Sequence, residues 1–94
     1  MANVEVYYSD MCGLCHVAMD YLTENNILFD KYKLKWDAKA DDWEDTDASR
    51  RLFERCGEKV GFVPQFFIND HWVSGWRELE PLINSGELHT MLQN

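Results

Sequence analysis

The chain has 94 residues, of which 46% are hydrophobic and 14% aromatic, so we expect one folded domain over residues 1–94 and exclude intrinsic disorder. Its 17 acidic and 9 basic side chains give a formal net charge of -8. That charge would repel phosphates and anionic lipids, so we expect neither nucleic acid nor a membrane as a partner. A protein that carries a basic patch would instead be attracted.

The N-terminal residues and the cysteines predict the compartment. Asn3, Glu5 and Asp10 interrupt any early apolar run, so no signal peptide is expected, and no stretch approaches the ~18 apolar residues of a membrane span. We therefore expect a cytoplasmic protein in a reducing compartment, where three cysteines do not form a disulfide framework. The C-G-L-C motif of residues 12–15, with Cys56 standing alone, then indicates redox or metal chemistry.

The first third of the chain predicts a strand, a helix and a second strand. Apolar and polar residues alternate over 4–8, as in a short strand. Apolar residues then recur at helical spacing over 14–22, which predicts an amphipathic helix that ends at the Asn25-Asn26 pair. Alternation returns over 27–34. Two strands joined by one helix in so short a span form a βαβ unit with parallel strands.

Residues 36–47 form an acidic segment with two tryptophans. Six of its side chains are acidic, and Lys39 is its only basic residue. We expect a solvated loop that leads into a helix. The alternative is that Trp36 and Trp43 anchor a partner protein.

A second helix is predicted over residues 48–56. Thr46 or Asp47 would cap its start, and Gly57 would end it. Cys56 falls on the same face as the apolar residues of this helix, so we expect it to be a small buried core residue.

The remaining residues predict a hairpin and a third helix. Residues 63–68 form a strand that begins at a proline, and the Asn-Asp turn at 69–70 returns the chain as a strand over 71–73. A helix over 77–83 follows, in which Pro81 is expected either to delay the start or to tighten the first turn, and a short helical turn covers 88–92. The whole order predicts an α/β fold, with a small sheet of mixed direction and helices on its faces.

The C-x-x-C pair lies where a strand ends and a helix begins. The N–H groups of a first helical turn lack partners and the helix dipole is positive there, so the pKa of Cys12 should fall below its free value. Cys15 is one turn later on the same face, so the two sulfurs can meet. We expect Cys12 to be the nucleophile and Cys15 to resolve the mixed disulfide. Asp10 opposes this by raising the pKa of Cys12, unless Arg77 or Lys59 folds close.

Two other uses of these cysteines are disfavoured. The C-x-x-C-H sequence of residues 12–16 fits covalent haem attachment, but it is embedded in a βαβ pattern and lacks the export signal that such proteins need. A zinc site would need two further ligands, and none of the available side chains has finger-like spacing. We therefore expect no metal here. We expect His16 to face solvent and assign no role to His71 or His89.

Several motifs, in this order, resemble those of glutaredoxins. They are V-E-V-Y at residues 4–7, C-G-L-C-H at 12–16, V-P-Q-F-F-I at 63–68, S-G at 74–75 and S-G-E-L at 85–88. The resemblance spans nearly the whole chain. It implies a thioredoxin fold, in which a four-stranded mixed sheet is flanked by helices in the order βαβ-α-ββ-α. It also implies a glutathione-dependent thiol–disulfide oxidoreductase with a redox-active disulfide.

The resemblance places glutathione in a groove beside Cys12, whose sulfur would meet the glutathionyl sulfur. Leu14 would line this groove. Pro64 would be cis and would pack beside the thiols, and the backbone of Val63 would pair with the cysteinyl part of glutathione. The γ-glutamyl end would meet the start of a helix, where a carboxylate is stabilised. The residues at that helix start are Gly75, Trp76 and Arg77.

The chain departs from the family pattern at three places around this groove. Ser9, also expected at the groove, stands where many glutaredoxins have a lysine that meets the glycyl carboxylate. Arg77 and Glu78 stand where many have two aspartates. Ser74 replaces the first of two paired glycines.

The resemblance implies that the protein reduces protein disulfides or glutathione mixed disulfides, as a monomer, with ribonucleotide reductase as one possible acceptor. A second hypothesis is a [2Fe–2S] cluster carrier or sensor, because Gly13 stands where dithiol glutaredoxins commonly have proline. Two protomers would then each supply Cys12 as a cluster ligand, and two glutathiones would complete the set. A third is a redox-inert adaptor that uses residues 36–47 to bind a basic partner.

Overall fold

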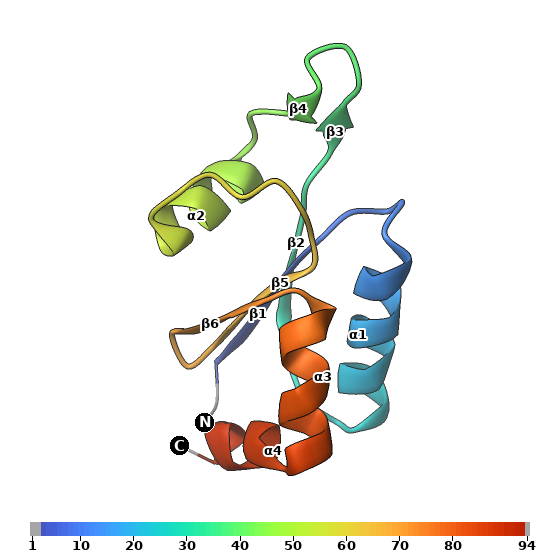
Figure 1. Cartoon of the computed structure of the whole chain (residues 1–94), viewed down its shortest axis with the longest axis vertical. Helices are drawn as coiled ribbons and strands as arrows, with labels where there is room; N and C mark the ends of the chain where they lie inside the picture. The colour runs from blue at the N-terminus through green and yellow to red at the C-terminus, as the bar shows by residue number, and fades with distance from the viewer. Residues whose placement is uncertain (1–2, 94) are drawn as a thin grey trace.

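The computed structural model describes residues 3–93 and has a central sheet of four strands, in the order β2-β1-β5-β6 (Figure 1). These strands are β1 (Val4–Tyr8), β2 (Asp30–Lys33), β5 (Gln65–Ile68) and β6 (His71–Ser74). The β1–β2 pair is parallel, and the β1–β5 and β5–β6 pairs are antiparallel. The mixed sheet confirms the expected thioredoxin fold. Strand β2 is shorter than the predicted 27–34, and β5 starts one residue after the proline.

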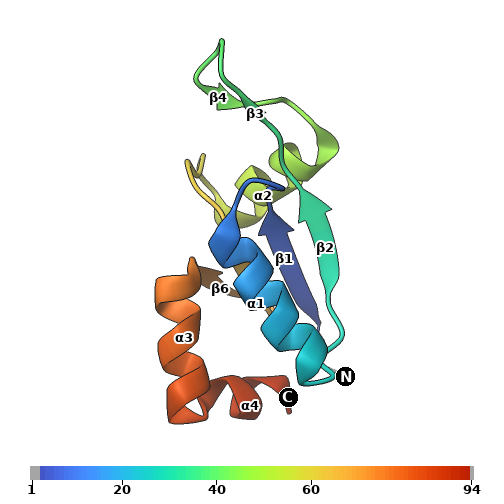
Figure 2. The same ribbon diagram turned by 90° about the vertical axis from the view of Figure 1, so that its right-hand side faces the viewer.

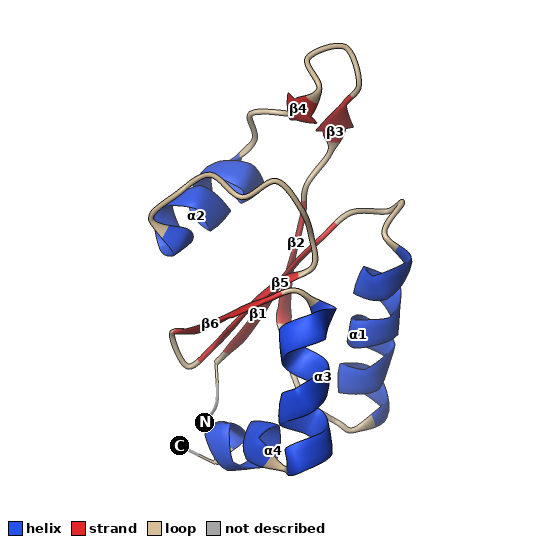
Figure 3. Ribbon diagram, in the orientation of Figure 1, coloured by secondary structure: helices blue, strands red, loops and turns tan. Residues whose placement is uncertain are grey.

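Three helices cover one face of the sheet (Figures 2 and 3). They are α1 (Gly13–Glu24), α3 (Trp76–Ser85) and α4 (Glu87–Leu92). Within the described part of the chain, no helix is long and apolar enough to cross a membrane. Pro81 lies inside α3, which nevertheless begins at Trp76, so the proline does not delay the helix. The core of this face is formed by Val4, Val6, Ala18, Leu22, Phe66, Ile68, Val73, Leu79 and Leu88.

Helix α2 (Asp47–Cys56) covers the other face. Thr46 caps it in a reciprocal pair with Ser49, and Gly57 ends it in the left-handed conformation at φ 75°. The caps agree with the sequence prediction, and the helix begins one residue before the predicted 48. A second core lies beneath this helix and contains Tyr7, Leu34, Leu52 and Phe67.

A buried carboxylate joins β1 to α2. Glu5 is 3% exposed, and it accepts hydrogen bonds from the Tyr7 hydroxyl at 2.7 Å and from Arg51 Nη2 at 3.0 Å. Arg55 Nε lies 3.5 Å from the same carboxylate. Burial and the neighbouring Glu5 raise the pKa of Tyr7 far above its usual value. The charge of Glu5 is therefore balanced by two guanidinium groups that also hold α2 against the sheet.

The segment expected to be a loop between β2 and α2 is instead a small hairpin. Strand β3 (Trp36–Asp37) pairs antiparallel with β4 (Asp42–Trp43), and the two tryptophan rings meet edge-on, with centroids 5.0 Å apart. The Asp37 carboxylate accepts hydrogen bonds from the backbone N–H groups of Lys39 and Ala40, which closes the turn. A loop was the wrong expectation because a cross-strand aromatic pair stabilises two strands that are too short to show alternation.

The hairpin extends past the end of the central sheet (Figure 1) and is tied to the body near its base. The indole Nε1 of Trp43 donates to the carbonyl oxygen of Val60 at 3.0 Å, and Lys59 forms an ion pair with Asp42. These contacts join the hairpin to the loop that precedes Pro64. The hairpin and that loop therefore face the same end of the sheet as the two cysteines.

Candidate active site

Cys12 is the N-cap residue of α1, and Cys15 lies one turn later. The two form a disulfide, with their Cα atoms 5.2 Å apart, and Cys12 Sγ accepts a hydrogen bond from the Cys15 N–H at 3.1 Å. Cys12 is partly exposed, whereas Cys15 is 0% exposed. A thiolate at position 12 would receive that N–H and the positive end of the helix dipole, and it alone of the two sulfurs is open to a substrate.

A lysine offsets the negative charge beside Cys12. Asp10 forms an ion pair with Lys33 Nζ at 3.1 Å, and this contact raises the pKa of Lys33. Neither candidate from the sequence pairs with Asp10: Lys59 pairs with Asp42, and Arg77 forms no ion pair within residues 3–93. Lys33 was missed because it reaches Asp10 through the parallel pairing of β1 with β2, which sequence spacing does not reveal.

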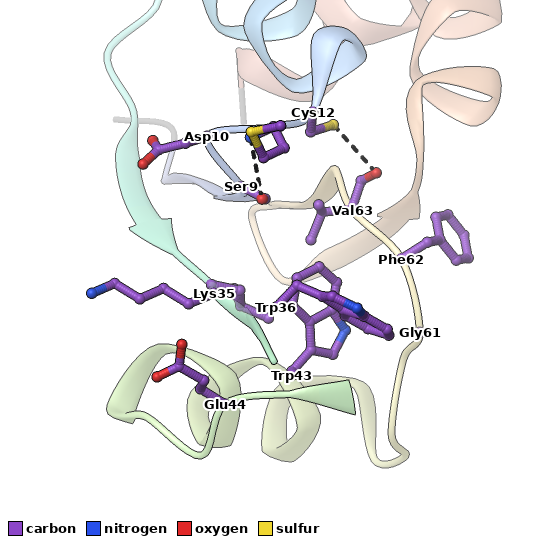
Figure 4. Close-up of a pocket in the computed structure, with 12 residues that line it drawn as sticks. Ser9, Asp10, Cys12, Lys35, Trp36, Trp43, Glu44, Gly61, Phe62 and Val63 are labelled. Atoms are coloured by element: carbon purple, nitrogen blue, oxygen red, sulfur yellow. Dashed lines mark hydrogen bonds between the residues drawn. The ribbon is translucent and has the colours of Figure 1, made fainter. Parts of the chain in front are cut away.

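The loop before β5 forms the opposite wall of the site. The Val63–Pro64 peptide bond is cis, as the family resemblance implied, and the Val63 carbonyl oxygen lies 3.5 Å from Cys12 Sγ (Figure 4). The fully buried Gln65 holds this loop in place, since its amide donates to the Phe62 carbonyl at 3.0 Å and accepts from Trp72 Nε1 at 2.8 Å. The backbone beside the reactive sulfur is therefore fixed by side chains outside the site.

A groove of about 330 Å³ runs from this loop to the start of α3. Gly75 caps that helix at φ 86°, and a Cβ there would lie 3.1 Å from the ring of Phe62, so any other residue is strained and crowded at this position. Glu78 turns toward the backbone, where it accepts from the Ser74 N–H at 3.1 Å. Six of the seven residues expected to contact glutathione line this groove: Leu14, Val63, Pro64, Gly75, Trp76 and Arg77.

Ser9, the seventh, lies elsewhere. It lines a second and larger pocket, of about 690 Å³, between Cys12 and the 36–43 hairpin (Figure 4). Trp36 and Trp43 form the floor of this pocket, and Phe62 separates it from the groove. The two tryptophans of the acidic segment were the only sequence signal for this pocket, and they did not indicate that Cys12 lines the same pocket.

The other candidate ligands do not gather around the cysteines. Within residues 3–93, no three histidine, cysteine, aspartate or glutamate side chains converge on a point that would hold a metal ion. Cys56 is only partly buried, rather than buried as predicted, because it lies at the end of α2. Burial and the nearby Glu58 raise the pKa of its thiol to about 11, so it is a poor nucleophile.

A thioredoxin fold with a disulfide at the start of its first helix and a cis-proline loop beside it defines a thiol–disulfide oxidoreductase of the thioredoxin class. Comparison with known proteins identifies the family. The chain is 30% identical over 95 residues to glutaredoxin 3 of Escherichia coli (strain K12), covering 99% of this chain and 100% of that protein. It therefore belongs to the glutaredoxin family, and its activity is that of a thiol–disulfide oxidoreductase. No family model matches the chain.

Solved structures agree on the fold. The glutaredoxin of Brucella melitensis is 27% identical, with a TM-score of 0.68 over 98% of this chain and 89% of that one. The buckwheat glutaredoxin–glutathione complex is 19% identical, with a TM-score of 0.70 over 96% of this chain and 76% of that one. At such identity the second likeness establishes the fold alone.

Proposed function

We propose that the protein uses glutathione to reduce glutathione mixed disulfides and protein disulfides. The observation that carries this proposal is the groove beside Cys12, which gathers six residues expected to contact glutathione from α1, the cis-proline loop and α3. The similarly folded buckwheat glutaredoxin, solved with glutathione, supports the same use of the fold. The assignment of individual contacts is part of the proposal.

The groove offers complementary charge to one end of glutathione. Arg77 is exposed at the start of α3 and forms no ion pair with any residue in the 3–93 range. The first N–H groups of a helix of this length also attract a carboxylate. We infer that the γ-glutamyl carboxylate binds at this helix start beside Arg77, which stands where many glutaredoxins have an aspartate that meets the γ-glutamyl ammonium instead. The net charge of -8 opposes glutathione only at long range.

The reaction with a glutathionylated protein would take two exchanges. The Cys12 thiolate attacks the glutathionyl sulfur, so that a Cys12–glutathione disulfide forms and the protein–sulfur bond breaks. The protein thiolate leaves and takes up a proton. A second glutathione thiolate then attacks the bound glutathionyl sulfur, which releases oxidised glutathione and restores the Cys12 thiolate. One disulfide is consumed and one is formed, and one glutathione thiol is oxidised for each protein thiol that is released.

The reaction with a protein disulfide would need both cysteines. Cys12 attacks one sulfur and forms a mixed disulfide with the protein, whose second sulfur leaves as a thiol. Cys15 then attacks Cys12 Sγ, which forms the Cys12–Cys15 disulfide and frees the second protein thiol. Two glutathiones reduce that disulfide in turn. The burial of Cys15 suits this step, because it keeps the second thiol from other oxidants.

Two variants test the proposal. We expect Cys12→Ser to abolish turnover of a small glutathione mixed disulfide coupled to glutathione reductase and NADPH, because no other exposed thiolate can attack. Cys15→Ser should keep that activity but lose the reduction of protein disulfides. If wild type fails on the glutathione substrate yet reduces a protein disulfide when coupled to thioredoxin reductase, glutathione is not its reductant.

Electron donation to ribonucleotide reductase stays a prediction from the family resemblance, and a cytoplasmic location stays a prediction from the N-terminal residues and the cysteines. The cluster-carrier alternative stays a prediction from Gly13, which stands where dithiol glutaredoxins commonly have proline. Reduction of the disulfide would free Cys12 as a cluster ligand. A colourless monomer after anaerobic incubation with iron, sulfide and glutathione would exclude this alternative.

The other alternative is a redox-inert adaptor that binds a basic partner through residues 36–47. Partner binding by the Cys12→Ser, Cys15→Ser double variant would favour the adaptor.

A further inference from the structure

Two pockets adjoin the reactive sulfur, and a glutathionylated protein has two halves. Cys12 itself lines the larger pocket, and Val63, whose carbonyl oxygen lies 3.5 Å from Cys12 Sγ, lines both. The glutathionyl half has the groove at the start of α3. The larger pocket lies on the other side of Phe62 and Val63, between Cys12 and the hairpin (Figure 4). We propose that this hairpin pocket binds the protein half of the mixed disulfide, and that it selects cysteines flanked by apolar and basic residues. The inference rests on the proposed function and names the substrate class of the same site.

The apolar wall of the hairpin pocket is exposed and preformed. Trp36 is 46% exposed and Phe62 53%, although large apolar side chains are usually left open to water only in scattered positions. Their setting is fixed, because Trp36 packs edge-on against Trp43, whose indole N–H is bonded to the Val60 carbonyl. Rigid aromatic side chains of this kind are the usual anchors of a protein interface.

The charge around the hairpin pocket favours a basic segment. Several cations near the hairpin already have acidic partners: Lys33 pairs with Asp10, Lys59 with Asp42, and Arg50 with Asp45 and Asp47. Among residues 3–93, Asp37, Asp41 and Glu44 form no ion pair, and of these Glu44 lines the pocket. Lys35, which lines the pocket, and Lys39 form no ion pair within residues 3–93 either, but the six acidic side chains of residues 36–47 outnumber Lys35, Lys39 and the paired Lys59 and Arg50. An incoming lysine or arginine would therefore meet a net negative charge, and an acidic segment would be repelled.

Ser9 makes the two pockets unlike each other. It lines the hairpin pocket at the position where many glutaredoxins carry a lysine, so no positive charge at this position attracts a carboxylate. The groove, by contrast, carries Arg77. Anionic glutathione is thus favoured on the α3 side, and a basic polypeptide on the hairpin side. In the exchange, the glutathionyl sulfur moves from the substrate cysteine to Cys12, and the protein thiolate leaves through the hairpin pocket and takes up a proton from water.

Two glutathionylated peptides of equal length test the proposal. Both peptides place leucine beside the modified cysteine. The residues outside these leucines are lysine in one peptide and glutamate in the other. We expect wild type to show about tenfold higher kcat/KM for the lysine peptide at low salt, and a smaller preference at high salt. Trp36→Ala should lower kcat/KM for the lysine peptide about five- to tenfold and leave a small mixed disulfide within about twofold. Glu44→Gln should reduce the lysine-to-glutamate preference about two- to fivefold.

Two control variants separate this effect from a general loss of structure. Leu28→Ala removes a side chain that is 81% exposed near the start of β2, and it should leave kcat/KM unchanged for every substrate. Trp36→Phe keeps the apolar wall and should restore most of the activity on the lysine peptide. Equal losses on the small substrate and the peptide in Trp36→Ala, or equal wild-type rates on both peptides, would overturn the inference and leave the proposed function standing. No wild-type turnover of even the small substrate would overturn both.

Discussion

Gly75 is the position at which one added methyl group tests both the fold and the site. Its φ of 86° and ψ of 166° fall in a region that is open essentially to glycine alone, where another residue costs about 1–3 kcal/mol. An alanine Cβ would also lie 3.1 Å from Phe62 Cε2, and that ring must move because the backbone cannot. We expect Gly75→Ala to lower the free energy of unfolding by about 2 kcal/mol, which for a chain of this size is a fall in Tm of about 8–16 °C.

Two other glycines calibrate this measurement. Gly57→Ala also places a side chain at positive φ, but in the milder left-handed helical region and with no atom within 4 Å, so about 1 kcal/mol is expected. Gly61→Ala has open space and no positive φ, and should stay within about 0.5 kcal/mol of wild type. Urea unfolding would measure all three, and kcat/KM on a small mixed disulfide would report the displaced Phe62. The reasoning is refuted if Gly75→Ala loses no more stability than Gly61→Ala.

Two further predictions concern groups away from the disulfide. Glu5→Gln should lower the free energy of unfolding in urea by about 1.5–3 kcal/mol, because it removes the buried charged acceptor of Arg51 and Tyr7. Exposed Glu58→Gln is the control, and an equal loss of stability in both variants would contradict the buried role of Glu5. Cys56 has its pKa raised to about 11, so in the oxidised protein its alkylation by iodoacetamide should be slow at pH 8 and rise steadily toward pH 11. A rate that levels off near pH 9 would mean that the thiol is not shielded.

The sequence predicts the frame of this protein well, because its elements are long enough to show a period or a cap. Helix α2 begins and ends where Thr46 and Gly57 indicate, and the β5–β6 turn lies at the Asn-Asp pair, where both residues have positive φ. The two cysteines were placed correctly by their position between a strand and a helix. Local signals were sufficient in each of these cases.

The features that the sequence did not predict depend on contacts between distant segments. The alternation of residues 4–8 suggests one wet face, yet Glu5 is buried because α2 packs over it with two arginines. The hairpin depends on a cross-strand pair of tryptophans, and the neutralisation of Asp10 depends on strand pairing with Lys33. The division of the site into two pockets depends on the hairpin, the loop before Pro64 and the start of α3, because Phe62 lines both pockets. Such arrangements become visible only once the chain is folded.

The complete burial of Cys15 has a practical consequence for finding the partners of this protein. Of the two active-site cysteines, only Cys12 can meet an outside sulfur, so every covalent adduct formed in the redox cycle is attached at one known atom. In Cys15→Ser, without glutathione, no neighbouring thiol remains to release that adduct. A substrate protein would then stay linked to Cys12 through a stable disulfide, and mass spectrometry of the linked peptide would identify both the protein and the cysteine that it presents.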